Sequence, residues 1–487
     1  MSYHIAVDIG ASSGRLILAT YHDDHHDQNI LFEEIHRFNN GFSLVDGHER
    51  WSITELCHEV LTGLQLAKKR GIEQCTVGID TWAVDYVLLD EKGQLIAEPI
   101  AYRDNRTNNA MNEFEQFISK ENIYQKTGIQ FLNFNTLYQL FKESPKSLSK
   151  AKHLLFIPDY LGYVLTGRKV GEKSNVSSSQ FLNLDTGTYD KELLDKANVP
   201  ISILPELVDS GTTLGPLKTS LKETGLYPAC EVIAVATHDT ASAVVGIPVV
   251  ESSGNWAYLS SGTWSLIGVE LTEPINGPEA LEANYTNEWG AEHTYRFLKN
   301  ITGMWSVQEI ARMINYELSY AEMAKAASQV EPFQQFIDLN DERFTNPDNM
   351  IEAIRSYCRE TNQIVPQTVG ELVMAVYSNL ALSYAYEMGR IERLTGTKFD
   401  TLHVVGGGSN VQLLNQLTAD LLGIPLLAGP GEGTAIGNIL IQMINQKVFD
   451  NLAEARQFLA TQIEVKTYTP QTTYPNDLIS RYIAKVK

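Results

Sequence analysis

The first apolar runs of the chain are short and are separated by small or polar residues. Two of these runs flank the segment IGASSG, a pattern that predicts a strand, a glycine turn and a second strand. Strands are predicted at 3–8, 15–21, 31–38, 76–79 and 85–89, and apolar residues at helical spacing predict a helix at 53–69. A group of strands followed by helices indicates an α/β unit.

A second unit with the same plan begins near residue 245. Apolar runs at 255–260 and 263–270 flank the small residues SSGT, as the first two runs flank IGASSG, which predicts a structural duplication. The later segments predict a helix at 369–394, a strand at 401–405, a helix at 410–422, and a strand, a turn and a core helix within LLAGPGEGTAIGNILI. We therefore expect two α/β domains, residues 1–244 and 245–487. Because no low-complexity linker separates them, packed domains with a hinge are favoured.

The composition fits a folded protein and excludes several kinds of partner. A chain of 487 residues is too long for one hydrophobic core, and no apolar stretch is long enough to cross a bilayer. The first residues, MSYHIAVDIG, enter a strand pattern without a secretory signal, which predicts a cytoplasmic protein. The net charge of −21, from 38 basic and 59 acidic residues, leaves no basic face for nucleic acid. Four widely spaced cysteines favour buried, reduced thiols over a zinc site or a disulfide framework.

Three turns rich in small residues carry the candidate chemistry. In DIGASSGR the bare backbone can direct N–H groups at phosphate oxygens, and Asp8 can hold a hydrated divalent cation beside them. SSGTW has the matching place in the second unit, where Thr263 offers a hydroxyl donor to a phosphate. VVGGGSN stands between a strand and a helix, and its three glycines suit a base or a ribose that lies on the backbone. Each turn alone is also typical of an ordinary connection between elements.

His238 and Asp239, in the segment VATHDTASAV, come where an apolar run changes into a helical stretch. A carboxylate at such a place is either a helix N-cap or a group held toward a substrate. These ten residues alone leave both interpretations open.

Together the three turns resemble the two phosphate hairpins and the adenosine-binding motif of the actin/hexokinase/Hsp70 superfamily. THDTASA narrows the resemblance to the sugar kinases of the glycerol kinase/xylulokinase family. The segments IHRFNNG, GIDTWAVDYVLLD, AYRDNRT, GIQFLNFNTLYQL, YLSSGTWSL, LKNITGMW and GNILIQ resemble, in order, those members of the family that act on L-rhamnulose. The resemblance extends from residue 1 to beyond residue 470. It implies two RNase H-like (actin-type ATPase) domains with a substrate cleft between them.

The resemblance also implies an activity. A protein of this kind would use ATP and Mg²⁺ to phosphorylate the C1 hydroxyl of L-rhamnulose, giving the 1-phosphate in L-rhamnose degradation, and would be a monomer or a homodimer without nucleic-acid or membrane partners. Asp239 would be the general base, and the sugar would contact Ala83, His238, Thr240 and Asn300. The nucleotide would contact Ala11, Ser12, Ser13, Gly14, Arg15, Thr263, Gln308 and Gly407, with Asp8 near the Mg²⁺.

Two positions depart from the family's pattern. Ala83 stands where DTWGVD has a glycine, which adds a methyl group to the sugar pocket, and Val411 stands where an asparagine is expected after GGGS, with Asn410 adjacent. The nearest alternative is a kinase for another ketose, L-fuculose or D-xylulose. A non-catalytic sugar sensor is disfavoured because the chain begins with its first strand instead of a basic helix-turn-helix. A chaperone-type ATPase is disfavoured because no peptide-binding domain follows the second unit.

Three weaker patterns favour structural roles. The stretch YHDDHHDQN, with His22, His25 and His26, predicts a solvated hairpin tip instead of a metal site. NDERFTNPDN lacks the central glycine and the final glutamate of a calcium loop, so a surface loop is expected. Trp51 and Trp305 are expected to pack in the interior.

Overall fold

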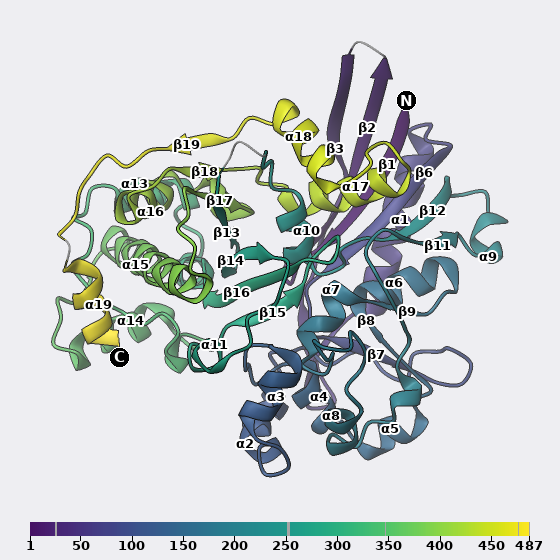
Figure 1. Cartoon of the computed structure of the whole chain (residues 1–487), viewed down its shortest axis with the longest axis horizontal. Coiled ribbons are helices and arrows are strands. Elements are labelled where there is room, and N and C mark those ends of the chain that lie inside the picture. Colours follow the sequence, from purple (N-terminus) through teal and green to yellow (C-terminus); the bar gives the residue numbers. More distant parts are fainter. Residues whose placement is uncertain (25–26, 251–253, 346, 476, 487) are drawn as a thin grey trace. The chain divides into compact units, whose positions relative to one another are not determined.

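The computed structural model describes residues 1–24, 27–250, 254–345, 347–475 and 477–486, and these form two compact units (Figure 1). Each unit is assembled from segments that are far apart in the sequence. Unit 1 comprises residues 1–249, 270–297 and 433–462, and unit 2 comprises residues 250–269, 298–432 and 463–487. The predicted α/β class with two domains is confirmed, whereas the division at residues 244 and 245 stays a prediction.

Unit 1 is built on a six-stranded sheet in the order β11-β12-β6-β1-β2-β3. Strands β12, β6 and β1 are parallel, and β1, β2 and β3 follow one another as antiparallel hairpins. The bounds are β1 Ser2–Ile9, β2 Ser13–Asp24, β3 Asp27–Asn39, β6 Gln74–Thr81, β11 Thr212–Pro216 and β12 Ala229–Ala234. The predictions at 3–8, 15–21, 31–38 and 76–79 are confirmed, while His25 and His26 of the predicted hairpin tip lie outside the described residues.

The two faces of this sheet differ in chemistry because successive side chains of a strand point to opposite sides. Ile5, Val7 and Val77 pack in an apolar core with α1 (Ile53–Lys69) and α6 (Ile157–Thr166). The alternate positions of β1 and β6 lie under α17 (Gly433–Asn445), which packs in turn against α10 (Asp239–Val245). The helix predicted at 53–69 is confirmed, with Lys68 and Lys69 in its last turn, where they complement the helix dipole.

The remaining elements of unit 1 are short. Three two-stranded sheets pair β4 (Phe42–Val45) with β5 (His48–Trp51), β7 (Tyr86–Leu89) with β8 (His153–Phe156), and β9 (Val170–Glu172) with β10 (Glu206–Val208). The strand predicted at 85–89 therefore exists as β7, but it pairs with β8 outside the main sheet. The other elements are α2 Ala110–Phe114, α3 Lys120–Thr127, α4 Thr136–Phe141, α5 Pro145–Lys150, α7 Lys173–Val176, α8 Lys191–Lys196, α9 Thr219–Lys222, α11 Pro278–Glu282, β15 Thr286–Trp289 and α18 Leu452–Gln462.

Unit 2 repeats the strand plan of unit 1. Its strands lie in the order β16-β14-β13-β17-β18-β19. β13 pairs antiparallel with β14 and parallel with β17, just as β1 pairs with β2 and β6, so the predicted duplication is confirmed. The bounds are β13 Trp256–Ser261, β14 Trp264–Leu271, β16 Tyr295–Thr302, β17 Thr401–Val405, β18 Leu426–Ala428 and β19 Lys466–Tyr468.

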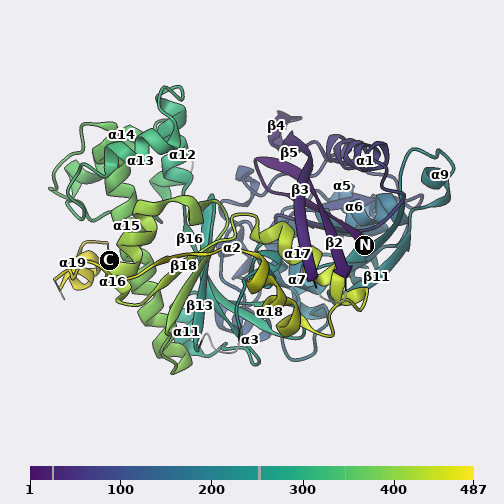
Figure 2. The ribbon, with the colours of Figure 1, turned by 90° about the horizontal axis from the view of Figure 1, so that it is seen from above.

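The central helix of unit 2 is α15 (Val369–Thr395), which packs against α13 and α16 (Figure 2). A capping box begins it, because the Thr368 hydroxyl accepts the N–H of Glu371 and the Glu371 carboxylate accepts the N–H of Thr368. Gly396, in the left-handed conformation, ends it. The other helices are α12 Trp305–Met313, α13 Tyr320–Ala327, α14 Met350–Glu360, α16 Gln412–Leu422 and α19 Leu478–Val486. No helix in the described part of the chain is long and apolar enough to span a bilayer.

Candidate active site

Three aspartates of unit 1 lie at the carboxyl ends of parallel strands. Asp8 on β1 and Asp80 on β6 are direct register partners, so their side chains share the face of the sheet that α17 covers. The segment after β12 continues alongside, because the N–H of Thr81 donates to the carbonyl of Thr237 at 2.9 Å, and it leads to Asp239. In open α/β sheets this edge is where ligands bind.

The charges of these aspartates act on one another. Burial raises the pKa of Asp80 well above its ordinary value, and the neighbouring Asp8 carboxylate raises it further. Burial also raises the pKa of Asp239; His238 opposes this effect and Asp8 adds to it. Asp8 itself is paired, since Arg15 donates from Nε at 3.0 Å and from NH2 at 2.8 Å to its Oδ2. The structure thus brings together three of the predicted site residues, Asp8, Arg15 and Asp239.

Asp239 is the first residue of α10, and its N-cap position is occupied by His238. The Asp239 Oδ1 atom accepts the backbone N–H of Thr240 at 2.5 Å and the Thr240 hydroxyl at 3.2 Å. His238 Nε2 lies 3.5 Å from the same oxygen. Among the described residues no hydrogen bond reaches the Oδ2 atom, and 32% of the side chain is exposed. The N-cap interpretation of Asp239 is therefore wrong, and one carboxylate oxygen is available to a ligand.

Buried polar groups hold the segment that precedes Asp239. Glu172 Oε2 accepts both the N–H of Thr237 at 3.0 Å and its hydroxyl at 2.8 Å. The Ser174 hydroxyl accepts the N–H of His238 at 3.3 Å. Because these donors are buried, leaving them without partners would cost free energy, so the three hydrogen bonds stabilise the loop in this conformation. The sequence analysis missed Glu172 and Ser174, since nothing in the local pattern links them to residues 237 and 238.

His238 belongs to a second buried group that the sequence analysis also missed. Its Nδ1 atom lies 3.1 Å from Glu288 Oε2 on β15 and 3.1 Å from Arg296 NH2 on β16. Arg296 is fully buried and donates to Glu288 Oε2 at 2.9 Å. Burial raises the pKa of Glu288, but the Arg296 guanidinium and His238 outweigh that effect and hold it below the ordinary value. An arginine within the apolar run YRFL was the one sequence feature that could have indicated this group.

The segment DTWAVD forms a strained turn in unit 1. The N–H of Asp85 donates to the carbonyl of Ala83 at 2.9 Å, which makes a three-residue turn centred on Val84 with φ +68°. A β-branched residue rarely adopts this conformation, and such strain concentrates at functional sites. The half-buried Ala83 is next to Trp82, whose indole is buried against Trp51 with ring centroids 4.3 Å apart. The interior packing predicted for Trp51 is confirmed.

The first hairpin turn has the predicted small-residue form. The N–H of Gly10 donates to the carbonyl of Ser13 at 2.9 Å, and Asn40 donates from its side chain to the carbonyl of Gly10 at 2.8 Å. Ala11 and Ser13 are half-buried and Ser12 is exposed, so the tip of the turn is open to a ligand. Gly14 differs, because it is buried against the ring of Phe38, which leaves no room for a side chain.

The second hairpin turn, in unit 2, is braced by the segment ITGMW. The N–H of Gly303 donates to the carbonyl of Thr263 at 3.1 Å, and that of Met304 to the carbonyl of Gly262 at 2.9 Å. The Thr263 hydroxyl is 3.3 Å from Gln308 Oε1, on the helix that follows. The side chains of Thr263 and Gln308 are thus in contact, while Asn300 lies half-buried on β16.

Of the three glycines at 406–408, two pack against Ser261 and one is exposed. A Cβ atom on Gly408 would come within 2.0 Å of the Ser261 hydroxyl, and Gly406 has φ +80° beside the Ser261 carbonyl. Gly407 has open space around it and is exposed, so a flat ligand could approach its backbone. The helix predicted at 410–422 begins later, at Gln412, because residues 407–410 form a 3₁₀ turn that ends at Val411 with ψ 84°.

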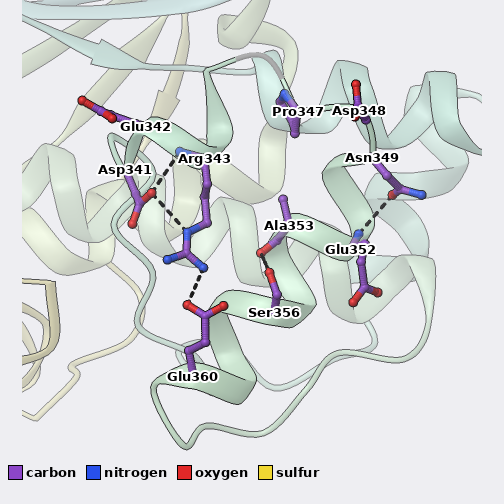
Figure 3. A pocket seen from close by; sticks show the side chains of 10 residues that line it. All are labelled: Asp341, Glu342, Arg343, Pro347, Asp348, Asn349, Glu352, Ala353, Ser356 and Glu360. Carbon is purple, nitrogen blue, oxygen red and sulfur yellow. Dashed lines mark hydrogen bonds and ion pairs between the residues drawn. The ribbon is translucent and has the colours of Figure 1, made fainter.

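A surface pocket of unit 2 is lined by a different set of residues (Figure 3). It occupies the predicted surface loop, where Arg343 joins Asp341 at 3.1 Å and Glu360 at 2.8 Å. Its described lining is Asp341, Glu342, Arg343, Pro347, Asp348, Asn349, Glu352, Ala353, Ser356 and Glu360. None of the predicted site residues is in that set, so the pocket is no part of the candidate active site.

In each of the two α/β units, a small-residue hairpin joins two antiparallel strands, and the first of these strands pairs with a parallel strand. The N-terminal domain of the FGGY family of carbohydrate kinases matches residues 3–246, and the C-terminal domain of that family matches residues 257–445. The chain belongs to the FGGY family of carbohydrate kinases, which confirms the predicted enzyme class.

Close relatives within the family share one name. The chain is 51% identical over 482 residues to the rhamnulokinase of Lactiplantibacillus plantarum, covering 99% of this chain and 98% of that protein. It is 49% identical over 479 residues to the rhamnulokinase of Bacillus subtilis, covering 98% of each.

Solved structures with low sequence identity share the fold. The xylulose kinase of Lactobacillus acidophilus aligns with a TM-score of 0.77 at 17% identity, covering 99% of this chain and 96% of that one. The Plasmodium falciparum glycerol kinase with ADP also aligns with a TM-score of 0.77, at 14% identity, covering 100% of this chain and 97% of that one. These likenesses support the fold and not a choice of sugar.

Proposed function

We propose that this protein transfers the γ-phosphoryl group of ATP to the C1 hydroxyl of L-rhamnulose, giving L-rhamnulose 1-phosphate in L-rhamnose degradation. Support for the sugar comes from relatives named rhamnulokinase, which are about half identical over nearly the whole chain. The observation that carries the chemistry is the Asp239 carboxylate at the strand ends, with Oδ1 hydrogen-bonded and Oδ2 open to a ligand.

In the proposed reaction Asp239 is the general base. Its Oδ2 takes the proton of the C1 hydroxyl while the hydroxyl oxygen bonds to the γ-phosphorus and ADP leaves with the electrons of the broken P–O bond. A carboxylate whose pKa is raised by burial is a better proton acceptor near neutral pH, which suits this role. The contacts of Oδ1 with Thr240 fix the direction of Oδ2. Most of the rate enhancement would come from such positioning.

The residues beside Asp239 also fit a magnesium ion. Asp8 and Asp80 offer carboxylate oxygens, the ligands that Mg²⁺ prefers, and Asp80 Oδ1 is buried with no hydrogen-bond partner among the described residues. Asp8 is the side chain that would hold the ion together with phosphate oxygens. Bound there, Mg²⁺ would neutralise charge on the phosphates.

We assign the other predicted residues to the two substrates. Ala83, His238, Thr240 and Asn300 would contact the sugar. The phosphates and the adenosine of ATP would contact Ala11, Ser12, Ser13, Gly14, Arg15, Thr263, Gln308 and Gly407. The methyl group of Ala83 beside buried Trp82 provides an apolar surface of the kind that the C6 methyl group of a deoxy sugar requires.

A panel of ketoses with ATP tests the choice of sugar. We expect turnover of L-rhamnulose to exceed that of L-fuculose and D-xylulose, with the product phosphate on C1 by NMR. Comparable turnover of D-xylulose with none of L-rhamnulose would replace this function by that of the alternative kinase. Binding of sugars without any ATP consumption would instead favour a sugar sensor.

Replacing the proposed base tests the mechanism. Asp239→Asn keeps the size of the side chain and removes its basicity, so kcat should fall by about 10²- to 10⁴-fold while sugar and ATP binding change little. Asp195→Asn, at the end of a surface helix, is the matched control and should keep full activity. Near-normal turnover in the Asp239 variant would remove this residue from the base role.

A further inference from the structure

Two charged residues, Glu288 and Arg296, are far from Asp239 in the sequence and contact its neighbour His238. Arg296 and Glu288 are buried on adjacent segments, and the His238 ring touches both through Nδ1 at 3.1 Å. The opposite ring nitrogen, Nε2, faces Asp239 Oδ1 at 3.5 Å. The imidazole therefore connects a buried ion pair to the carboxylate that we propose as the base.

The two partners of Nδ1 favour opposite tautomers of a neutral imidazole, because Arg296 donates to an unprotonated Nδ1 whereas the Glu288 carboxylate accepts from a protonated one. Arginine can only donate, so its hydrogen bond to His238 requires Nδ1 to be the acceptor. The proton is then on Nε2, which lies 3.5 Å from Asp239 Oδ1. In the other tautomer, the Nδ1–H group would face the Arg296 donor and the Nε2 lone pair would face the Asp239 carboxylate. Only Glu288 would gain a hydrogen bond, and Arg296 already balances its charge.

We propose that Glu288 and Arg296 are positioning residues for phosphoryl transfer: Glu288 holds Arg296, and Arg296 holds His238 in the tautomer that donates from Nε2 to Asp239. This inference rests on the proposed function, since it concerns the same carboxylate. Thr240 donates two hydrogen bonds to Oδ1, and an Nε2–H group 3.5 Å from the same oxygen adds to them, which leaves Oδ2 as the atom that takes the sugar proton. Neither residue touches the reacting atoms.

The tautomer can be measured directly by ¹⁵N NMR of histidine-labelled protein, with the His238 signals identified by their loss in His238→Gln. In the neutral imidazole we expect Nε2 to carry the proton and Nδ1 to be the acceptor. A proton on Nδ1 would overturn the proposal. Because this measurement needs no sugar and no turnover, its outcome is independent of whether L-rhamnulose is the substrate or Asp239 the base.

A double variant removes the control of the tautomer without leaving a buried charge alone. Glu288→Leu with Arg296→Met replaces the ion pair by apolar groups of similar volume, a change that folded proteins often tolerate. We expect kcat to fall by about tenfold or more with a smaller change in KM for ATP, because a charge-assisted contact is lost at the base. Arg296→Lys keeps a donor and should retain most of the activity.

A double-mutant cycle with His238→Gln tests whether the ion pair acts by positioning His238 or whether its loss damages the fold in general. If the ion pair acts through His238, adding the double variant to His238→Gln should lower kcat by less than about twofold more. An equal loss in both backgrounds would contradict the proposal. Glu270→Gln, which breaks the partly buried Arg456–Glu270 pair of 2.8 Å in the same unit, is the control for losing an ion pair and should leave kcat unchanged. If the double variant does not fold, the NMR tautomer and Arg296→Lys still decide.

Discussion

At the scale of single residues, Asp85 shows how one carboxylate can organise several aromatic groups. Its Oδ2 accepts from the indole of Trp51 at 2.6 Å and from the indole of Trp82 at 2.9 Å, and its Oδ1 accepts from Gln139 at 2.9 Å. Burial raises its pKa to about 6, although these hydrogen bonds lower it. The native protein therefore keeps a proton on Asp85 at a pH where the unfolded chain has lost it.

The sign of the resulting pH dependence follows from linkage. Asp85 stabilises the fold most at a pH below its unfolded pKa, and this contribution falls as the pH rises through the native value of about 6. From about pH 5.5 to about pH 8 the loss should be on the order of 1 kcal/mol. Asp85→Asn is expected to be destabilising at both pH values, since the amide cannot accept all of these bonds, but less so at the higher pH. Urea unfolding at the two pH values measures the difference. A larger deficit at the higher pH would contradict the assignment.

Short motifs in the sequence point to some residues of the candidate site and not to others. Asp8, Asp239 and Gly407 stand in motifs whose residues are consecutive, so a local pattern is enough to propose them. Glu172 and Glu288 act through contacts with residues 65 and 50 positions away, and no local pattern encodes such pairings. The steric need for Gly14 was also hidden, because it depends on Phe38 across the hairpin.

At the scale of elements, α10 and α17 pack closely because small residues line their contact. A Cβ atom on Gly437 would lie 1.8 Å from the Ser242 carbonyl, and one on Gly246 would lie 2.2 Å from the Gly433 carbonyl. Only glycine allows the two backbones to approach this far. Since α10 begins at Asp239, this contact also fixes the position of the proposed base.

Overpacking this contact should therefore affect both stability and activity. Gly437→Ala forces the helices apart and should lower the free energy of unfolding by about 1–3 kcal/mol, with a fall in kcat. Gly389→Ala is the control, because Gly389 is an exposed position of α15 with open space around it. That change should raise stability by about 0.5–1 kcal/mol through helix propensity. Equal effects of the two substitutions in thermal unfolding would show that the contact is looser than the structure indicates.

Long elements with a regular pattern were predicted well, and element ends were not. The helices at 53–69 and 369–395 have an apolar periodicity sustained over several turns, so the sequence alone locates them. The helix after GGGS begins at Gln412, because residues 407–410 form a 3₁₀ turn before it. The partner of β7 could not be predicted, since β8 lies 67 residues further on in the sequence.

At the scale of the whole molecule, residues 433–462, late in the chain, complete the unit that contains the N-terminal strands. Asn438 of α17 donates to Asp80 Oδ2 at 2.6 Å, and Gln442 donates to the carbonyl of Ile5 at 3.0 Å. The Thr76 hydroxyl donates to Gln442 Oε1 at 2.6 Å. The predicted duplication describes the strand order of both units, but it does not reveal that 433–462 covers β1 and β6.

Residues 1–297, which include all of unit 1 except 433–462, should consequently fail to fold cooperatively on their own, because the polar groups of β1 and β6 under α17 would lose their partners and the apolar surface beside them would be exposed. A peptide of residues 433–462, added in trans, should restore near-UV circular dichroism and a single unfolding transition, since it supplies Asn438 and Gln442. The same peptide with Gly437→Ala should restore far less, because its added methyl group collides with Ser242. A fragment that unfolds in one sharp transition without the peptide would show that α17 adds to a unit already complete. Equal rescue by the two peptides would show that the stabilisation comes from α18 and not from the close contact of α17 with α10.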